Sequence, residues 1–123
     1  MSPVYEKRRV RVFAVITILL LSSAALPQAR IRFARGRTTA VLRGSVLGGN
    51  TNPYILRASA GQTMSVHLSS RGGARFELYA YRGPTLAEST TDWEGELPLS
   101  TDYLIVVTTA NRRADYTLEV TIR

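Results

Sequence analysis

The feature that most constrains the fold is an alternation of apolar and polar residues that recurs from residue 54 onward. In YILRA (54–58), TMSVHL (63–68), RFELYAY (75–81) and DYTLEVTI (115–122), every second residue is apolar. Side chains on a β-strand point alternately to opposite faces, so a period of two predicts strands with one buried face. β-branched and aromatic residues are frequent in these runs, which also favours strands over helices.

Turn-forming residues separate the alternating runs at short, regular intervals. They are Gly36, GGNTNP (48–53), AGQ (60–62), RGG (71–73), RGP (82–84) and ANRRA (110–114). The turns divide the chain into about eight short strands. We place them at residues 31–33, 40–46, 54–58, 63–68, 75–81, 96–99, 103–107 and 115–122. This pattern predicts an all-β chain that folds as a single antiparallel β-sandwich.

Two segments depart from the simple alternation. YLIVV (103–107) is apolar at every position, which predicts a central strand that is covered on both faces. Residues 84–94 have no strand period and form the longest irregular stretch. We expect these residues to cross between the two sheets.

The first 29 residues have the features of an export signal and are set apart from the fold. A basic segment (7–11) precedes an apolar core (13–26) and then small residues, which permits cleavage after Ala25 or Ala29. Export would place the protein in the periplasm or outside the cell, with no membrane segment left. The uncharged window over residues 12–29 is also close to the roughly 20 residues of a spanning helix, so an uncleaved anchor is the alternative. The arginines that follow it oppose translocation.

The remaining residues, 30–123, are enough for one β-sandwich domain and too few for two. The chain has no cysteine, which excludes a disulfide framework, a thiolate metal site and a catalytic thiol. This domain carries twelve arginines and eight acidic residues, a net charge of +4. Six of the arginines lie in residues 30–57 and five of the acids in residues 88–102, so we expect a domain with a basic and an acidic side.

No combination of residues indicates an enzyme or a cofactor. The single histidine, His67, is out of phase with its apolar neighbours, so we expect it to face solvent with no Ser or Asp placed to orient it. One histidine and no cysteine are too few for a transition-metal site. Asp92, Glu94 and Glu96 could converge on calcium in a loop, but the Asp/Asn/Gly pattern of calcium loops is absent. We expect no catalysis, no cofactor and no bound metal.

The arginine-rich segment ARIRFARGR (29–37) raises the possibility of an anionic partner. Nucleic-acid binding would combine such arginines with several stacking aromatics. Phe33 is the only aromatic residue here, and export separates the protein from nucleic acid, so we expect no nucleic-acid partner. The alternatives are a solvated edge strand, whose charges prevent aggregation, and attachment to an anionic cell-envelope polymer through residues 30–43.

Three aromatic residues are candidates for a binding face. Tyr79 and Tyr81 are out of phase with the apolar positions of their strand, so we expect them to point outward. Trp93 is the only tryptophan in the chain and lies between Asp92 and Glu94. These aromatics could form one recognition patch. In the alternative interpretation Trp93 plugs the open end of the sandwich and the tyrosines cover a neighbouring strand.

Several motifs follow one another along residues 33–122: FARG (33–36), RGSVLGG (43–49), YILRASAGQTMSVHLS (54–69), ELPLSTDYLIVV (96–107) and ADYTLEVTI (114–122). Their order and spacing resemble the bacterial periplasmic inhibitors of goose-type (g-type) lysozyme, and more broadly the pre-peptidase C-terminal-like β-sandwich. In this pattern Gly61 permits a tight turn and Gln62 bonds the backbone of that turn. Tyr103 and Tyr116 would be buried anchors with hydroxyls at the rim. Thr101 replaces a glycine common in the family, which leaves that turn's type open.

The resemblance implies an exported, non-enzymatic protein that occludes the active-site groove of a g-type lysozyme with surface loops. The matching loop is ANRRAD (110–115), where the candidate binding residues are Asn111, Arg112 and Arg113. One of the two arginines would pair with a catalytic carboxylate, and a solvated hairpin turn is the alternative. Lysozymes are usually basic, so only the acids of residues 88–102 offer attraction. The alternative function is a cell-envelope module that contacts anionic polymer or carbohydrate.

Overall fold

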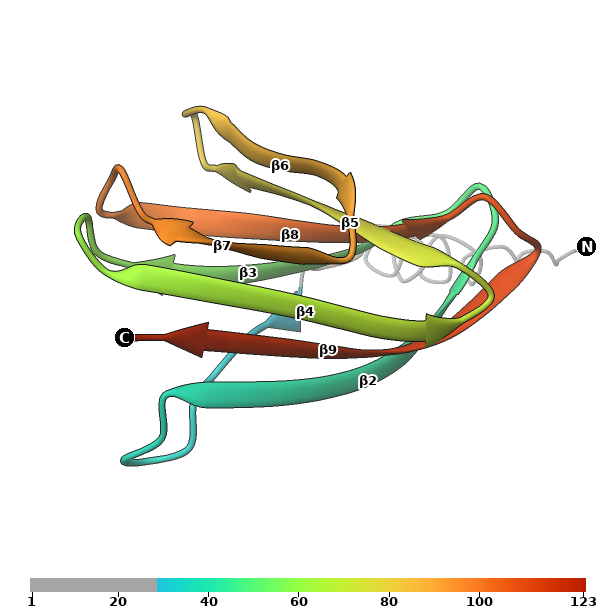
Figure 1. Ribbon diagram of the computed structural model, residues 1–123, viewed down its shortest axis with the longest axis horizontal. Helices are drawn as coiled ribbons and strands as arrows, with labels where there is room; N and C mark the ends of the chain where they lie inside the picture. The colour runs from blue at the N-terminus through green and yellow to red at the C-terminus, as the bar shows by residue number, and fades with distance from the viewer. Residues whose placement is uncertain (1–28) are drawn as a thin grey trace, which may run out of the picture.

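The computed structural model describes residues 29–123, which form two β-sheets packed face to face (Figure 1). The nine strands are β1 (Ala29–Arg30), β2 (Thr39–Leu47), β3 (Asn52–Ala58), β4 (Thr63–Arg71), β5 (Ala74–Ala80), β6 (Thr85–Thr90), β7 (Asp92–Glu96), β8 (Thr101–Thr109) and β9 (Arg113–Ile122). One sheet has the order β1-β3-β8-β5-β6 and the other β2-β9-β4-β7. Only the short β1–β3 pair is parallel. The predicted all-β sandwich is therefore confirmed.

The N-terminal expectations lie outside the described residues. The export signal of residues 1–29, its cleavage sites and the alternative membrane anchor stay predictions. Among residues 29–123 there is no helix long and apolar enough to cross a membrane.

The alternating residues of both sheets meet in one core. On the four-stranded sheet, Met64, Val66 and Leu68 of β4 all point inward and are buried, as the alternation predicts. The predicted central strand is also confirmed, because β8 lies in the middle of the five-stranded sheet. Its Leu104 is on the outer face and is still buried, between Ile55 of β3 and Tyr79 of β5.

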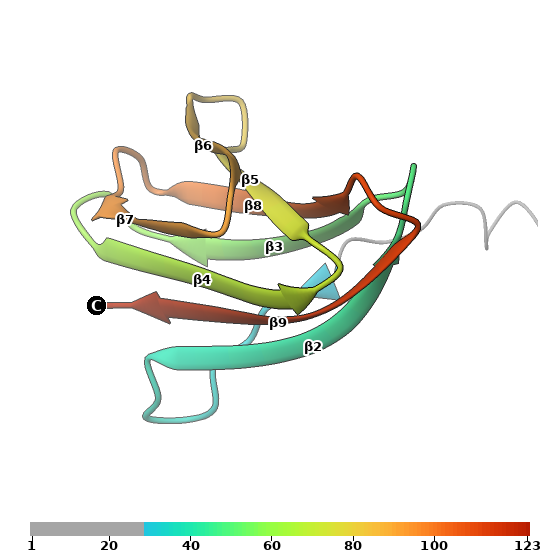
Figure 2. The same cartoon turned by 45° about the vertical axis from the view of Figure 1, so that its right-hand side comes forward.

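The expectation that residues 84–94 are irregular is wrong. They contain β6, which pairs with β5, and β7, which pairs with β4 in the other sheet. The chain does change sheets here, at Thr91, and Figure 2 shows β6 standing up from the sandwich while β7 follows β4. Register shifts interrupt the β5–β6 ladder, and Ser89 has a φ of 45°. These irregularities disrupt the period of two.

The two shortest predicted strands are also displaced. The strand expected at residues 31–33 is represented by β1, which ends at Arg30, and Ile31 then donates one backbone hydrogen bond to Ile55, at 2.9 Å. The strand expected at residues 96–99 ends with β7 at Glu96. Leu97 follows as a buried loop residue whose N–H bonds the Gln62 carbonyl oxygen at 2.8 Å.

Local turn chemistry agrees with the expectations from sequence. Gly61 has a φ of 91°, and Gln62 Oε1 accepts the Ser59 N–H at 2.8 Å inside the same turn. Thr101 begins β8 and is not among the residues with positive φ, so the absence of glycine imposes no strain. Tyr103 is buried, and its hydroxyl donates to the Leu99 carbonyl oxygen at 2.6 Å, which anchors the β7–β8 loop.

Tyr116 is buried as expected, but its hydroxyl is not at the rim of the sandwich. Its hydroxyl lies between the sheets, where it is 2.5 Å from the Tyr54 hydroxyl and accepts a hydrogen bond from Asn52 Nδ2 at 2.9 Å. A Cβ at Gly44 would approach the Tyr116 hydroxyl oxygen to 2.7 Å, so only glycine fits beside this pair. Burial first, and the bond to Tyr116 second, raise the pKa of Tyr54 far above its usual value.

Candidate functional site

The β8–β9 turn lies at one end of the sandwich, together with the β2–β3 and β4–β5 turns (right-hand end of Figure 1). The β2–β3 turn (48–51) and the β4–β5 turn (72–73) are short, glycine-rich segments that connect long strands. Each of the three turns connects a strand of one sheet to a strand of the other, so both sheets position this end of the sandwich. We call residues 48–51, 72–73 and 110–112 the turn cluster.

Asn111 locks the β8–β9 turn to the β4–β5 turn. Its side-chain Nδ2 donates to the Gly72 carbonyl oxygen at 2.6 Å, and its backbone N–H donates to Thr109 Oγ1 at 3.1 Å. Thr109 Oγ1 in turn donates to the same Gly72 carbonyl at 2.9 Å. Thr109 is the one buried polar residue of the described core. Asn111 is therefore a brace inside the turn cluster, with its side chain already engaged.

The β2–β3 turn approaches from the other side. Gly48 donates its backbone N–H to the Arg112 carbonyl oxygen at 2.9 Å. A Cβ at Gly48 would overlap the carbonyl oxygen of Asn111, so the close approach requires glycine. The backbone of Arg112 is thus fixed while its side chain remains exposed.

Arg112, in the turn, and Arg113, the first residue of β9, differ in what they contact. Arg113 Nε is 3.2 Å from Asp115 Oδ1, and Arg113 Nη2 donates to Ser45 Oγ at 3.1 Å. The Ser45 hydrogen bond, followed by Arg113, lowers the pKa of Asp115. Arg112 makes no side-chain hydrogen bond or ion pair with residues 29–123. Of the two, Arg112 is the guanidinium that is available to a partner.

A second group of predicted site residues lies on β7, at the edge of the four-stranded sheet. Asp92 and Glu94 point outward and are exposed, whereas Trp93 is half-buried and packs against the core. The indole lies over Gly95, where a Cβ would come within 2.7 Å of the ring. Of the two interpretations, covering the core fits Trp93 better than presenting a binding face.

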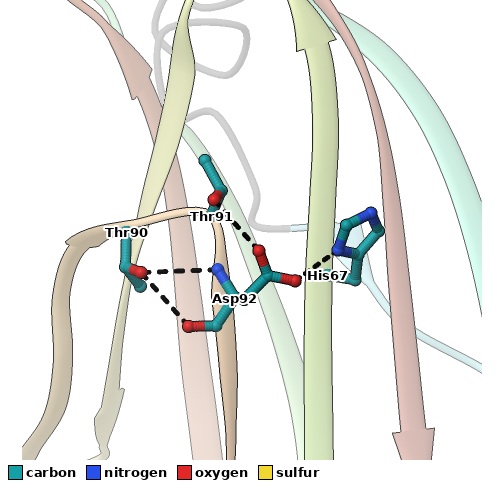
Figure 3. A network of polar contacts seen from close by, with 4 residues as sticks. All are labelled: His67, Thr90, Thr91 and Asp92. Atoms are coloured by element: carbon teal, nitrogen blue, oxygen red, sulfur yellow. Dashed lines mark hydrogen bonds and ion pairs between the residues drawn. The ribbon is translucent and has the colours of Figure 1, made fainter.

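The expectation for His67 is partly wrong. It is exposed, but Asp92 from the neighbouring strand contacts its Nδ1 (Figure 3). Thr91 Oγ1 donates to the other carboxylate oxygen of Asp92 at 3.1 Å, and Thr90 Oγ1 donates to the Asp92 carbonyl oxygen at 3.1 Å. The contact with His67, more than the one with Thr91, lowers the pKa of Asp92. This pair could not be predicted from the local sequence pattern, because 25 residues separate its members.

Tyr79 and Tyr81 lie elsewhere. Tyr79 is half-buried on the outer face of β5, in the five-stranded sheet. Tyr81 follows β5 in a turn, is 52% exposed, and has the Arg82 guanidinium 5.3 Å from its ring centroid. Because Trp93 covers the inner side of the other sheet, the three aromatics do not form one recognition patch.

The acidic residues of the segment 88–102 are also divided by the fold. Asp102 is on the five-stranded sheet, with Arg30 at 3.8 Å, whereas Asp92 and Glu94 are on the four-stranded sheet. Glu119 joins the latter pair, because β9 places it opposite His67. An open depression there is lined by Asp92, Glu94, Glu119 and His67 among others. Within residues 29–123, no three His, Asp or Glu side chains are grouped so that they could hold a metal.

Two of the arginines of residues 30–43 lie on different sheets. Arg30 is paired with Asp102 on the five-stranded sheet, and Arg43 lies on the outer face of β2 in the other sheet. Attachment to an anionic polymer through this segment stays a prediction.

The sequence matches no protein-family model and no curated protein. Solved structures do resemble it. The chain is 30% identical to PliG of Aeromonas hydrophila, a periplasmic lysozyme inhibitor of g-type lysozyme, with a TM-score of 0.69 over 77% of this chain and 95% of that one. PliG of Salmonella Typhimurium is 23% identical, with a TM-score of 0.63 over 77% and 96%. The pre-peptidase C-terminal domain of a Bacillus anthracis collagenase shares the fold at 14% identity and a TM-score of 0.55, over 80% and 98%.

Proposed function

Because the chain belongs to the family of periplasmic inhibitors of g-type lysozyme, we propose that it inhibits a g-type lysozyme by placing the turn cluster in the enzyme's active-site groove. The observation that carries the proposal is the 30% identity to an inhibitor over 95% of that inhibitor's length. The family consists of inhibitors and not of enzymes. The protein is accordingly a non-enzymatic one, and its partner in this proposal is the lysozyme itself.

The construction of the turn cluster supports a rigid insertion. Hydrogen bonds from Asn111 and Gly48 fix the backbone on both sides of Arg112. A turn that is already ordered loses little conformational entropy when it binds, which favours affinity. This brace also gives Asn111 a role that differs from direct contact with the enzyme.

The charge of Arg112 supports its placement against a catalytic group. Glycoside hydrolases depend on carboxyl groups beside the scissile bond. A guanidinium can bind such a carboxylate through two parallel hydrogen bonds, which an ammonium cannot. Arg113 is held by Asp115 and Ser45, so we assign the contact to Arg112.

The test is a turbidity assay of cell-wall lysis by a g-type lysozyme, with the purified protein added in increasing amounts. Truncation of one partner of a buried ion pair costs about 2–5 kcal/mol, so Arg112→Ala should weaken inhibition at least about 30-fold. Arg113→Ala is the matched control and should have a much smaller effect, because its exposed pairs are intramolecular. Undiminished lysis at a large molar excess of the unaltered protein would contradict the proposal.

We propose the periplasm as its location, since the relatives named above are periplasmic inhibitors. N-terminal sequencing of the protein recovered from periplasmic extract checks this placement. A sequence that begins after Ala25 or Ala29 is expected, and an intact Met1 in a membrane fraction would indicate the anchor instead.

A further inference from the structure

The edges of the two sheets are protected unequally. Three of the four edge strands have features that oppose pairing with another chain: β1 has two residues, β6 has an irregular register, and β7 has five residues with three acids. Short strands, bulges and charges are the usual protections of an edge. β2 largely lacks these protections, since it has nine residues in unbroken register with β9 and contains a single charged residue, Arg43.

Hydrogen bonds around β2 show which of its backbone groups face outward. Thr38 O and Gly48 N bond residues of the β9 side, namely Ile122 N and Arg112 O. Backbone groups alternate in direction along an antiparallel pair, so even-numbered residues of β2 face β9 and odd-numbered residues face away. The carbonyl oxygens of Ser45 and Leu47 are consistent with this alternation, because they accept hydrogen bonds from Asn52 and Asn50 on the side away from β9.

The open part of the edge is therefore the first half of the strand. The Asn52 and Asn50 bonds occupy the outward carbonyls of Ser45 and Leu47. Thr39, Val41 and Arg43 have no backbone partner on the outward side among residues 29–123. We call residues 39–43 the open edge.

The inner face of the open edge is apolar, and its outer face carries Val41 between Thr39 and Arg43. Val41 is 50% exposed on the outer face, and Ala40 and Leu42 are only partly buried on the inner face. A long edge strand with unpaired backbone groups, few charges and an exposed apolar side chain is a template for pairing with another strand. Among the strands of residues 29–123, β2 has a neighbour on one side only.

We propose that β2 pairs with β2 of a second copy, antiparallel about a twofold axis at Val41, so that two four-stranded sheets become one of eight strands. This register places Val41 opposite its symmetry mate and Arg43 opposite Thr39 of the other copy, and it uses all outward groups of the open edge in about six hydrogen bonds. The two Arg43 side chains are then about 13 Å apart along the strands, which avoids repulsion. Leu42 and Ala40 of the two copies meet on the inner face.

The twofold axis leaves the turn cluster free. The open edge is at the start of β2, and the turn cluster follows its end at Leu47 (Figure 1). Antiparallel pairing points the two turn clusters in opposite directions, so a dimer would present two separate inhibitory ends. The dimer does not depend on the proposed function, and each can fail without the other.

The chain contains no cysteine, so a single introduced cysteine reports this geometry directly. Residues in a hydrogen-bonded antiparallel pair have Cα atoms about 5.5 Å apart, within the range of a disulfide. Under mild oxidation Val41→Cys should form a covalent dimer at least tenfold faster than Leu47→Cys, which is equally exposed on the same strand but lies outside the open edge. Equal rates for the two variants would overturn the proposal.

Sedimentation equilibrium of the protein in the form recovered from cells gives an independent measurement of its oligomeric state. The unaltered protein and Leu47→Lys should shift from monomer to dimer between about 1 μM and 1 mM, and Val41→Lys should remain monomeric. Val41→Lys should keep full inhibition of lysozyme and an unchanged melting temperature within about 2 °C, which shows that it is folded. A monomer at every concentration for the unaltered protein, or equal loss of dimer in both lysine variants, would show that β2 does not self-pair.

Discussion

Removing one hydroxyl from the Tyr54–Tyr116 pair should have a different cost depending on which tyrosine loses it. Among residues 29–123, the Tyr116 hydroxyl has two partners, Tyr54 at 2.5 Å and Asn52 at 2.9 Å, whereas the Tyr54 hydroxyl has only Tyr116. Tyr54→Phe removes one hydrogen bond and leaves Tyr116 bonded to Asn52. Tyr116→Phe leaves the buried Tyr54 hydroxyl with no partner among residues 29–123.

The magnitudes follow from the difference between a lost bond and an orphaned polar group. A typical hydrogen bond contributes about 0.5–1.5 kcal/mol net, so Tyr54→Phe should lower the free energy of unfolding by about 1 kcal/mol. A buried group left without a partner costs about 1–3 kcal/mol more, so Tyr116→Phe should cost about 2–4 kcal/mol. Tyr54 is 8% and Tyr116 4% exposed, so water compensates little at either position.

Urea denaturation of the two single variants and the double variant measures these costs. The double variant should be less destabilised than the sum of the singles, because it removes the orphaned hydroxyl as well. Tyr103→Phe, whose hydroxyl bonds the β7–β8 loop at the other end of the molecule, is the control and should be additive with either change. If Tyr54→Phe costs as much as Tyr116→Phe, the asymmetry argued from Asn52 is wrong.

Two further changes, and a second measurement on Tyr54→Phe, test other contacts. Gly48→Ala should displace the β8–β9 turn, because its Cβ meets the Asn111 carbonyl, and should weaken lysozyme inhibition about tenfold or more while the core stays folded by circular dichroism. The lowered pKa of Asp92 contributes stability that is complete above about pH 4 and is lost as pH falls further, so His67→Ala should flatten the acid limb of stability against pH. The raised pKa of Tyr54 means that stability is retained up to about pH 10 and falls above it, and Tyr54→Phe should reduce this alkaline loss in urea titrations.

The strands that the sequence predicts best are those whose inner face is fully covered. β4, β5 and β9 have large apolar residues at alternate positions, and those residues are buried. Alternation is a local property of the extended backbone, so it is visible without knowledge of the neighbours. β6 and β7 are edge strands with few apolar residues, and bulges interrupt β6, so their local pattern is weak.

The position of the turn that carries the candidate site was predictable from the sequence, but the contacts that hold this turn in place were not. The ANRRAD loop follows from the turn residues between two strong strands, and the candidate residues Asn111, Arg112 and Arg113 lie within it. The hydrogen bonds that fix this turn could not be predicted, because Asn111 bonds Gly72 across 39 residues and Gly48 is still farther away in the chain. The same holds for the division between Arg112 and Arg113, which depends on Ser45 of another strand.

By itself the sequence determined the all-β class, the positions of the main turns and the alternation that separates core from surface, because these depend on residues close to one another in the chain. Tertiary structure alone decided which strands are neighbours and therefore which side chains meet. It separated Trp93 from Tyr79 and Tyr81, divided the acidic segment between two sheets, paired His67 with Asp92, and left one half of β2 open at an edge. Strand order is set by packing of whole faces across the core, which no short stretch of sequence records.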